Sequence, residues 1–197
     1  MKTKYLKIFF VITLSVSLYG CSSSDEDISK LNNGGSSGSS SSISGSYNID
    51  SITSNVTVDL NNDGFTSTDL FSEIDPDFFS TTAPDLEIKP VVYNNHVENI
   101  MSFYLPHPTV TVTTPNKQGS VKFSRNGLGY IFQFDSKTQT ISTENNNTAP
   151  DPEVYGNMLS VKVISKGKIQ AVFKKYYYDF KTVKWIALTI TCIYTKI

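Results

Sequence analysis

The alternation of apolar and polar residues in the C-terminal third most strongly constrains how this chain can fold. Residues 157–164, 169–178 and 183–194 each alternate in this way, and a period of two is the pattern of a half-buried β-strand. The connecting segments, 165–168 and 179–182, are only a few residues long. Because strands joined by such short turns pair in antiparallel fashion, this third is predicted to form a three-stranded antiparallel meander.

Similar segments upstream extend the prediction to most of the chain. Strands are predicted over 47–52, 86–93, 101–105, 110–114, 121–125, 128–134 and 138–143, and one short helix is predicted near 68–74. The pair Asn126-Gly127 favours the left-handed backbone of a tight hairpin and is predicted to join two of these strands. A succession of strands with short connections predicts an all-β fold, either an antiparallel up-and-down barrel or a two-sheet β-sandwich.

Composition agrees with one β domain of ordinary size. Residues 47–197 are rich in tyrosine, phenylalanine, valine, isoleucine and threonine, which favour strands, and their number suits a single domain. Cys192 is the only cysteine among them, so no disulfide can form within the domain. It shares one strand face with Leu188, Ile190 and Tyr194, which predicts a buried and unreactive thiol.

The N-terminus has the layout of a bacterial signal peptide. The start of the chain carries three lysines, and residues 8–18 carry no charge, an apolar run too short to span a bilayer as a helix. It leads to Gly20-Cys21, which resembles the lipobox of bacterial lipoproteins. The resemblance implies that residues 1–20 are removed and that Cys21 becomes an acylated anchor. A plain secretory signal with an incidental cysteine is the alternative.

A polar, low-complexity segment follows this cysteine. Residues 21–46 are rich in serine and glycine and bury too little apolar surface to fold, so they are predicted to form a flexible tether. The acidic cluster Asp25, Glu26 and Asp27 resembles the export signal of surface lipoproteins in Bacteroidota. We therefore expect a lipid-anchored protein of the outer membrane that is exposed at the cell surface. The alternative is that these acidic residues only keep the tether solvated.

Three short motifs resemble one group of these lipoproteins. Residues 45–49 read Gly-Ser-Tyr-Asn-Ile, residues 59–64 read Asp-Leu-Asn-Asn-Asp-Gly, and residues 177–180 read Tyr-Tyr-Asp-Phe. Together they are similar to the small lipocalin-like lipoproteins of Bacteroidota. The resemblance implies a calycin-like barrel over residues 47–197. It points to no particular activity, because most members of the group have none assigned.

One segment resembles the first part of a calcium-binding loop. Oxygen-bearing side chains at the spacing of such loops, with a glycine at the bend, are suited to a hard cation. Here they are Asp59, Asn61, Asp63 and Ser67, and Asp69 falls one position short of the final ligand. Leu70 occupies the place of the usual bidentate carboxylate. Calcium is therefore an optional ligand of a looser site closed by Asp69 or Glu73, and no other cofactor is expected. A glycine turn followed by a capped helix is the alternative.

Charge and histidine content argue against two classes of function. The net charge is −1, and the basic residues of the C-terminal half are dispersed over predicted strands and turns, so no nucleic-acid partner is expected. His96 and His107 are the only histidines. Their spacing makes no metal-binding pair, and the chain contains no nucleophile motif such as Gly-x-Ser-x-Gly. We therefore expect no enzyme activity.

The remaining class is a surface-anchored binding module. A barrel interior lined by aromatic residues would offer a cavity for a small apolar ligand, with the candidates Tyr130, Phe132, Phe134, Phe173 and Trp185. Plain core packing is the alternative for each of these residues. The rival function is a structural or interaction protein of the envelope that binds a surface partner through its outer face and takes no small molecule. In either case a monomer is expected.

Overall fold

The computed structural model describes residues 42–197 except residue 94, residues 114–117 and residues 145–150. None of the described helices is long and apolar enough to cross a membrane. The strands are β1 (Gly45–Val58), β2 (Ser67–Asp69), β3 (Leu86–Tyr93), β4 (His96–Thr113), β5 (Gln118–Asp135), β6 (Thr140–Thr143), β7 (Asn157–Ser165), β8 (Lys168–Asp179) and β9 (Lys184–Lys196), and the helices are α2 (Pro76–Phe79) and α3 (Pro152–Tyr155).

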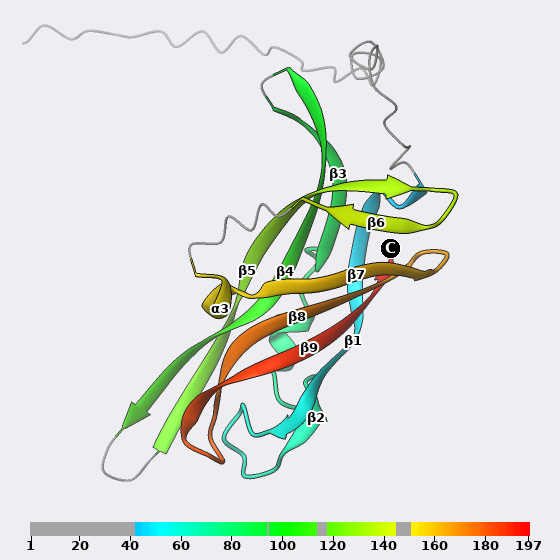
Figure 1. Cartoon of the computed structure of the whole chain (residues 1–197). Helices are drawn as coiled ribbons and strands as arrows, with labels where there is room; N and C mark the ends of the chain where they lie inside the picture. Colours follow the sequence, from blue (N-terminus) through cyan, green and yellow to red (C-terminus); the bar gives the residue numbers. More distant parts are fainter. Residues whose placement is uncertain (1–41, 94, 114–117, 145–150) are drawn as a thin grey trace, which may run out of the picture. The chain divides into compact units, whose positions relative to one another are not determined.

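Most strands that follow one another in sequence also lie next to one another in the sheet. The order is β6-β5-β4-β3-β1-β9-β8-β7, with β2 added beside β1, and every pairing is antiparallel. Because β1 pairs with β9, from Tyr47↔Lys196 to Ser54↔Ile190, the first and last strands lie side by side (Figure 1). The predicted all-β, antiparallel fold with up-and-down strand order is confirmed.

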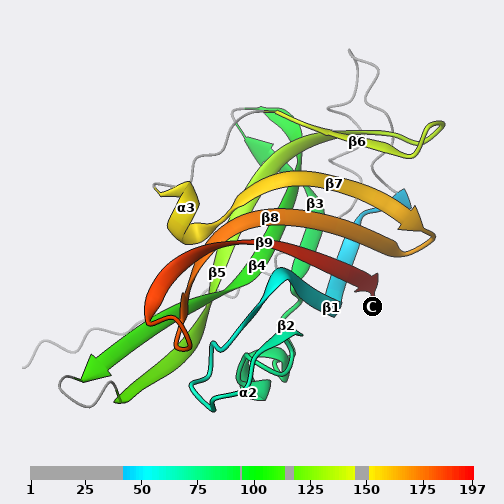
Figure 2. The same ribbon diagram turned by 60° about the horizontal axis from the view of Figure 1, so that its bottom comes forward.

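The sheet is curved but not closed (Figure 2). Its two edges are β6 and β7, which lie near each other without a ladder of hydrogen bonds between them in the described part of the chain. The architecture is therefore an open, curved sheet, compatible with either a barrel-like or a sandwich-like packing, with one face turned inward.

The inward face carries the apolar residues that the alternation predicts. On β8 every second residue is buried: Ile169, Ala171, Phe173, Lys175, Tyr177 and Asp179. Phe103 of β4 joins the two halves of the sheet, because its ring centroid lies 5.1 Å from that of Phe173 on β8 and 5.6 Å from that of Tyr194 on β9. Burying one such side chain contributes roughly 1.5–3 kcal/mol, so these contacts hold the curved sheet together.

Cys192 belongs to this core, as predicted. It is fully buried, and burial raises the pKa of its thiol to about 12. Because the thiolate is the reactive form of cysteine, this residue acts as a small apolar side chain.

The predicted hairpin at Asn126-Gly127 is wrong. The strands predicted on either side of it are one strand, β5, in which Asn126 and Gly127 pair with Leu105 and Tyr104 of β4. A Cβ atom on Gly127 would lie 3.1 Å from a ring carbon of Tyr104. This glycine therefore makes room for the tyrosine ring on the strand and does not form a turn.

β4 is likewise a single strand where two are predicted, although Pro106 and Pro108 lie within it. The N–H of Tyr104 donates to the carbonyl of Asp85 at 2.8 Å, so alternate residues of β4 point their backbone nitrogens toward β3. The pairing with β3 ends at Phe103. Both prolines come after that point. Their backbone nitrogens face the side on which β4 is no longer paired with β3, so the missing N–H groups break no hydrogen bond of the sheet.

The short helix lies later in the chain than predicted. Residues 68–74 hold the end of β2 followed by turns, and the N–H of Leu70 donates to the carbonyl of Ile52 at 2.9 Å, which ties this segment to β1. The helix α2 begins with a proline, and the carboxylate of Asp75 caps it by accepting the N–H of Asp77 at 2.9 Å. The proline in the first turn and the cap define this start.

The folded domain begins before the predicted boundary at Tyr47. Ile43 is buried, and its carbonyl accepts a hydrogen bond from the Tyr47 hydroxyl at 2.6 Å. Lys196 donates to the carbonyl of Ser44 at 2.5 Å. The last residues of the predicted tether are therefore part of the domain.

Candidate functional site

The five aromatic residues predicted to line a cavity do not come together. Tyr130 and Phe173 are buried in the core, and Phe132 and Phe134 are buried on the last part of β5. Trp185 is 50% exposed, because it is out of phase with the buried residues of β9. Tyr130 and Phe173 fill the interior, Phe132 and Phe134 border a separate pocket described below, and Trp185 lies on the outer face.

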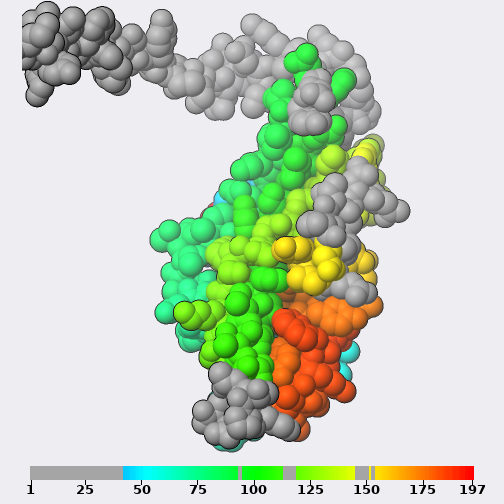
Figure 3. Space-filling model, turned by 90° about the vertical axis from the view of Figure 1, so that its left-hand side faces the viewer, coloured from blue at the N-terminus to red at the C-terminus, as the bar shows by residue number. Residues whose placement is uncertain are grey.

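Trp185 borders a pocket of about 630 Å³ at the place where β4, α3, β8 and β9 meet. Figure 3 shows this side of the molecule, with α3 in yellow between the green strands and the orange β8. The lining residues, which we call the Trp185 pocket, are His107, Pro108, Thr109, Asp151, Val154, Tyr176 and Trp185. This volume falls in the range of small-molecule sites.

The outer wall of the Trp185 pocket is aromatic. Trp185 pairs with Tyr178 across the β8–β9 ladder, and their ring centroids lie 5.8 Å apart in an edge-to-face arrangement. Phe180 packs on the other side of Tyr178, at 5.0 Å. Because Tyr178 and Trp185 stand on paired strands, their rings are held in place beside the pocket and form an apolar surface.

A buried cation lies behind the inner wall. Lys175 points inward from β8 and is fully buried. Its ammonium donates to the carbonyl of Val154, lies 3.4 Å from Nδ1 of His107 and 5.6 Å from the ring centre of Tyr177. Burial lowers the pKa of Lys175 to about 8, since removal from water penalises the charged form.

His107 links this lysine to the pocket. Its ring stacks on Tyr155 with centroids 5.5 Å apart, which fixes the plane of the imidazole. Burial, and then the charge of Lys175, lower the pKa of His107, so the imidazole is neutral at pH 7. The backbone of Val154 is a hydrogen-bond partner of the His107 ring and also accepts from the Lys175 ammonium, so the imidazole, the ammonium and α3 meet beside the pocket.

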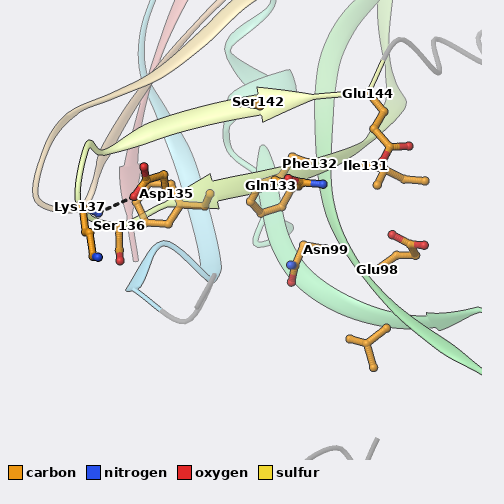
Figure 4. Close-up of a pocket in the computed structure, with 12 residues that line it drawn as sticks. Glu98, Asn99, Ile131, Phe132, Gln133, Asp135, Ser136, Lys137, Ser142 and Glu144 are labelled. Atoms are coloured by element: carbon orange, nitrogen blue, oxygen red, sulfur yellow. Dashed lines mark hydrogen bonds between the residues drawn. The ribbon is translucent and has the colours of Figure 1, made fainter. Parts of the chain in front are cut away.

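A second pocket, of about 580 Å³, lies between the start of β4 and the β5–β6 hairpin (Figure 4). Phe132 and Phe134 line it together with a charged rim made of Glu98, Asp135, Lys137 and Glu144. The carboxylate of Asp135 accepts the N–H of Lys137 at 2.8 Å. Since most of the lining is polar, the Trp185 pocket is the better site for an apolar ligand.

The residues predicted to bind calcium form a tightly hydrogen-bonded segment, which we call the acidic loop (59–69). Asp59 is buried, and its two carboxylate oxygens accept the N–H groups of Asn62 at 2.7 Å and Gly64 at 3.2 Å. A side-chain oxygen also accepts the N–H two residues further on at Asn61, Asp63, Ser67 and Asp69. These oxygens are engaged by the loop itself, as in Asx and ST turns.

Glu73 packs under the acidic loop. It is buried and accepts the N–H of Leu60 at 2.9 Å. Burial, with a further contribution from the charges of Asp63 and Asp59, raises the pKa of Glu73. In the described residues no three histidine, cysteine, aspartate or glutamate side chains are grouped so that they could hold a metal ion. The repulsion among these carboxylates is the feature that a cation would relieve.

The acidic loop is joined to the turn between β8 and β9. Oδ1 of Asp179 accepts the N–H of Asp59 at 3.0 Å, and the N–H of Phe180 donates to the carbonyl of Asp59 at 2.8 Å. Burial opposes ionisation of Asp179, yet hydrogen bonds from Thr182, Asp59 and Lys181 together hold its pKa below the usual value. Two of the motifs that carry the lipocalin-like resemblance thus contact each other.

Two residues beside the Trp185 pocket were missed by the sequence analysis. His107 stands between two prolines, a context that is typical of an irregular segment. Lys175 follows another lysine, a pattern that is typical of an exposed face. The position of Lys175 in the alternation of β8 would have revealed its burial, because it lies two residues from each of the buried Phe173 and Tyr177.

The predicted lipidation and export residues, Cys21, Asp25, Glu26 and Asp27, lie outside the described residues. No protein family, curated protein or solved structure matches the chain in comparisons with known proteins.

Proposed function

We propose that this protein is a surface-anchored binding module that takes a small apolar ligand in the Trp185 pocket. The observation that supports the proposal is a half-exposed tryptophan on the wall of a pocket of about 630 Å³. Isolated exposed apolar residues are common on protein surfaces, but a large aromatic side chain at a concave site is typical of recognition. The up-and-down strand order also agrees with the lipocalin-like resemblance.

The anchor is proposed from the sequence alone. Acylation of Cys21 would hold the domain to the outer membrane, and the acidic cluster at Asp25, Glu26 and Asp27 would direct it to the cell surface. Cys21→Ala is expected to release the protein from the membrane fraction. Alanines at the three acidic positions are expected to keep it anchored but protected from protease added to whole cells. A membrane-bound Cys21→Ala protein would contradict the anchor, and a triple variant cleaved as readily as the wild type would contradict the export signal.

Binding is tested with Nile red, an uncharged apolar dye whose emission rises in apolar surroundings. The wild-type domain is expected to bind it, and Trp185→Ala is expected to weaken binding about tenfold or more, because the lost apolar contact is worth roughly 1.5–3 kcal/mol. Phe65→Ala is the matched control, since Phe65 is 77% exposed and lies outside the pocket lining.

The rival function gives a different result. A structural or interaction protein that binds no small molecule would show the same weak Nile red signal in the wild type, in Trp185→Ala and in Phe65→Ala. That outcome would mean that the pocket binds no small apolar ligand, and the outer face of the sheet would then be the proposed interaction surface.

A further inference from the structure

The exposed tryptophan of the Trp185 pocket, on which the proposed function rests, ends a row of three aromatic rings. Tyr178 pairs with Trp185 across the β8–β9 ladder, and the two rings lie edge-to-face with centroids 5.8 Å apart. Phe180 packs edge-to-face on Tyr178 at 5.0 Å and lies outside the pocket lining. We call Phe180, Tyr178 and Trp185 the ring row. Because Trp185 is half exposed, its orientation depends on the side chains packed against its other half, and Tyr178 is one of them.

The far end of the ring row is seated on a glycine of β5. A Cβ atom on Gly119 would overlap one ring carbon of Phe180 and would lie 3.3 Å from another. Gly119 pairs with Val112 of β4, so it occupies a strand position and not a turn. A glycine weakens a strand interior and often marks a close approach of another group. Here it leaves the space into which the ring of Phe180 fits.

The acidic loop holds both members of this contact. The side-chain amide of Asn62 donates to the carbonyl of Gly119 at 3.0 Å, which fixes the seat. The N–H of Phe180 donates to the carbonyl of Asp59 at 2.8 Å, and Oδ1 of Asp179 accepts the N–H of Asp59 at 3.0 Å. These two bonds fix the backbone that carries the ring. The loop therefore joins β5 to the β8–β9 turn at the point where the ring row begins.

We infer that Phe180 is a positioning residue of the Trp185 pocket, and that the acidic loop serves this pocket by seating Phe180 on Gly119. Neither Phe180 nor the loop belongs to the pocket lining. They hold Tyr178, and through it Trp185, in one orientation, so that the ligand does not have to order the tryptophan when it binds. The inference thus adds to the proposed function a set of residues that set the affinity from outside the pocket.

The first measurement needs no ligand. Trp185 is the only tryptophan of the chain, so the anisotropy of tryptophan fluorescence reports how firmly its ring is held. Gly119→Ala displaces Phe180 and is expected to lower this anisotropy. Gly127→Ala is the matched control, because it is the same substitution in the same strand and brings a Cβ atom to 3.1 Å from a ring carbon of Tyr104, which is not in the ring row. It is expected to leave the anisotropy unchanged.

The second measurement is the affinity for Nile red. Gly119→Ala and Phe180→Ala are each expected to weaken binding roughly twofold to tenfold, the scale of one aromatic pair, while Gly127→Ala keeps the wild-type affinity. The double variant is expected to bind no worse than Phe180→Ala, because both changes act through one contact. Phe180→Ala also keeps the test decisive if Gly119→Ala does not fold.

Two asparagines test the part that the acidic loop plays. Asn62→Gly removes the bond to Gly119 but suits the left-handed backbone of this position, where φ is 64°. It is expected to lower both the anisotropy and the affinity for Nile red. Asn61→Gly is the matched control in the same loop, since its amide bonds Asp63 and Ser72 instead, and it is expected to change neither. Equal effects of the two substitutions would overturn the role of the loop.

The failures of the two proposals can be told apart. If the wild type binds no Nile red but the anisotropy falls as expected, the proposed function is wrong and the ring row still positions Trp185. If Nile red binds and both Gly119→Ala and Phe180→Ala match the wild type in anisotropy and affinity, the pocket stands and the positioning role is overturned. A loss of affinity from Gly119→Ala that persists in full when Phe180→Ala is already present also overturns it.

Discussion

At the scale of single residues, the burial of Lys175 predicts that the free energy of unfolding depends on pH. Its pKa falls from 10.5 to about 8 in the folded protein, so the unfolded chain binds more protons between these values and stability rises with pH across that window. Below about pH 8 the cost of the buried charge is fully present, and above 10.5 it is absent. Relative to Lys175→Met, the wild type is expected to gain on the order of 3 kcal/mol over this range.

The measurement is urea unfolding of both proteins from pH 7 to about pH 10.5. Titration of Cys192 and of the buried tyrosines also affects stability at alkaline pH, because burial raises their pKa values, but it does so in both proteins and cancels in the difference. Parallel curves for wild type and Lys175→Met would show that the lysine is solvated or paired.

The acidic loop gives a second prediction at this scale. If Asp59, Asn61, Asp63 and Ser67 ligate calcium, the ion binds only the folded state and stabilises it by about 1.4 kcal/mol at tenfold excess over Kd, a shift of a few degrees in the melting temperature. The shift is expected to vanish in Asp63→Ala and to persist in Asp77→Ala, an exposed acidic residue outside the loop. A melting temperature unmoved by about 10 mM calcium, some ten times the weak end of the range for extracellular sites, would leave the loop a hydrogen-bonded turn.

At the scale of elements, the joint between the acidic loop and the β8–β9 turn is expected to matter for stability. Asp179→Ala would leave the buried N–H of Asp59 without its acceptor, which costs about 1–3 kcal/mol, and it would also remove the acceptor of the Thr182 hydroxyl at 2.5 Å. Denaturant unfolding measures the loss. Asp50→Ala breaks the exposed ion pair with Lys168 and is expected to change stability little. Equal effects of the two substitutions would contradict the assigned role of the joint.

The same scale shows where sequence patterns were sufficient and where they were not. The meander of β7, β8 and β9 was predictable because one face of each strand is buried and the other is not, so the period of two is visible. β4 and β5 were each predicted as two shorter strands, because prolines and an Asn-Gly pair usually mark the end of a strand or a turn. Here the prolines lie where β4 no longer pairs with β3, and Gly127 makes room for the ring of Tyr104. These reasons depend on neighbouring strands and cannot be read from the chain itself.

At the scale of the whole molecule, the sequence predicted the fold class but not the candidate site. Trp185 could be singled out as an aromatic residue on a strand, but its position on the outer face depends on its phase in β9. The partners that complete the pocket come from β4, α3 and β8, which are brought together only by the curvature of the sheet. Lys175 is the clearest case, because a lysine in a strand is expected to be exposed and here it is fully buried.

The central claim is that the folded domain carries a small molecule in the Trp185 pocket. Native mass spectrometry on the wild type and on Trp185→Ala, each purified under mild conditions from the cells that make it, tests this claim most directly. The account predicts a reproducible small-molecule adduct on the wild type and little or no adduct on Trp185→Ala. A wild-type protein that carries no adduct, or an adduct that is unchanged in Trp185→Ala, would contradict it.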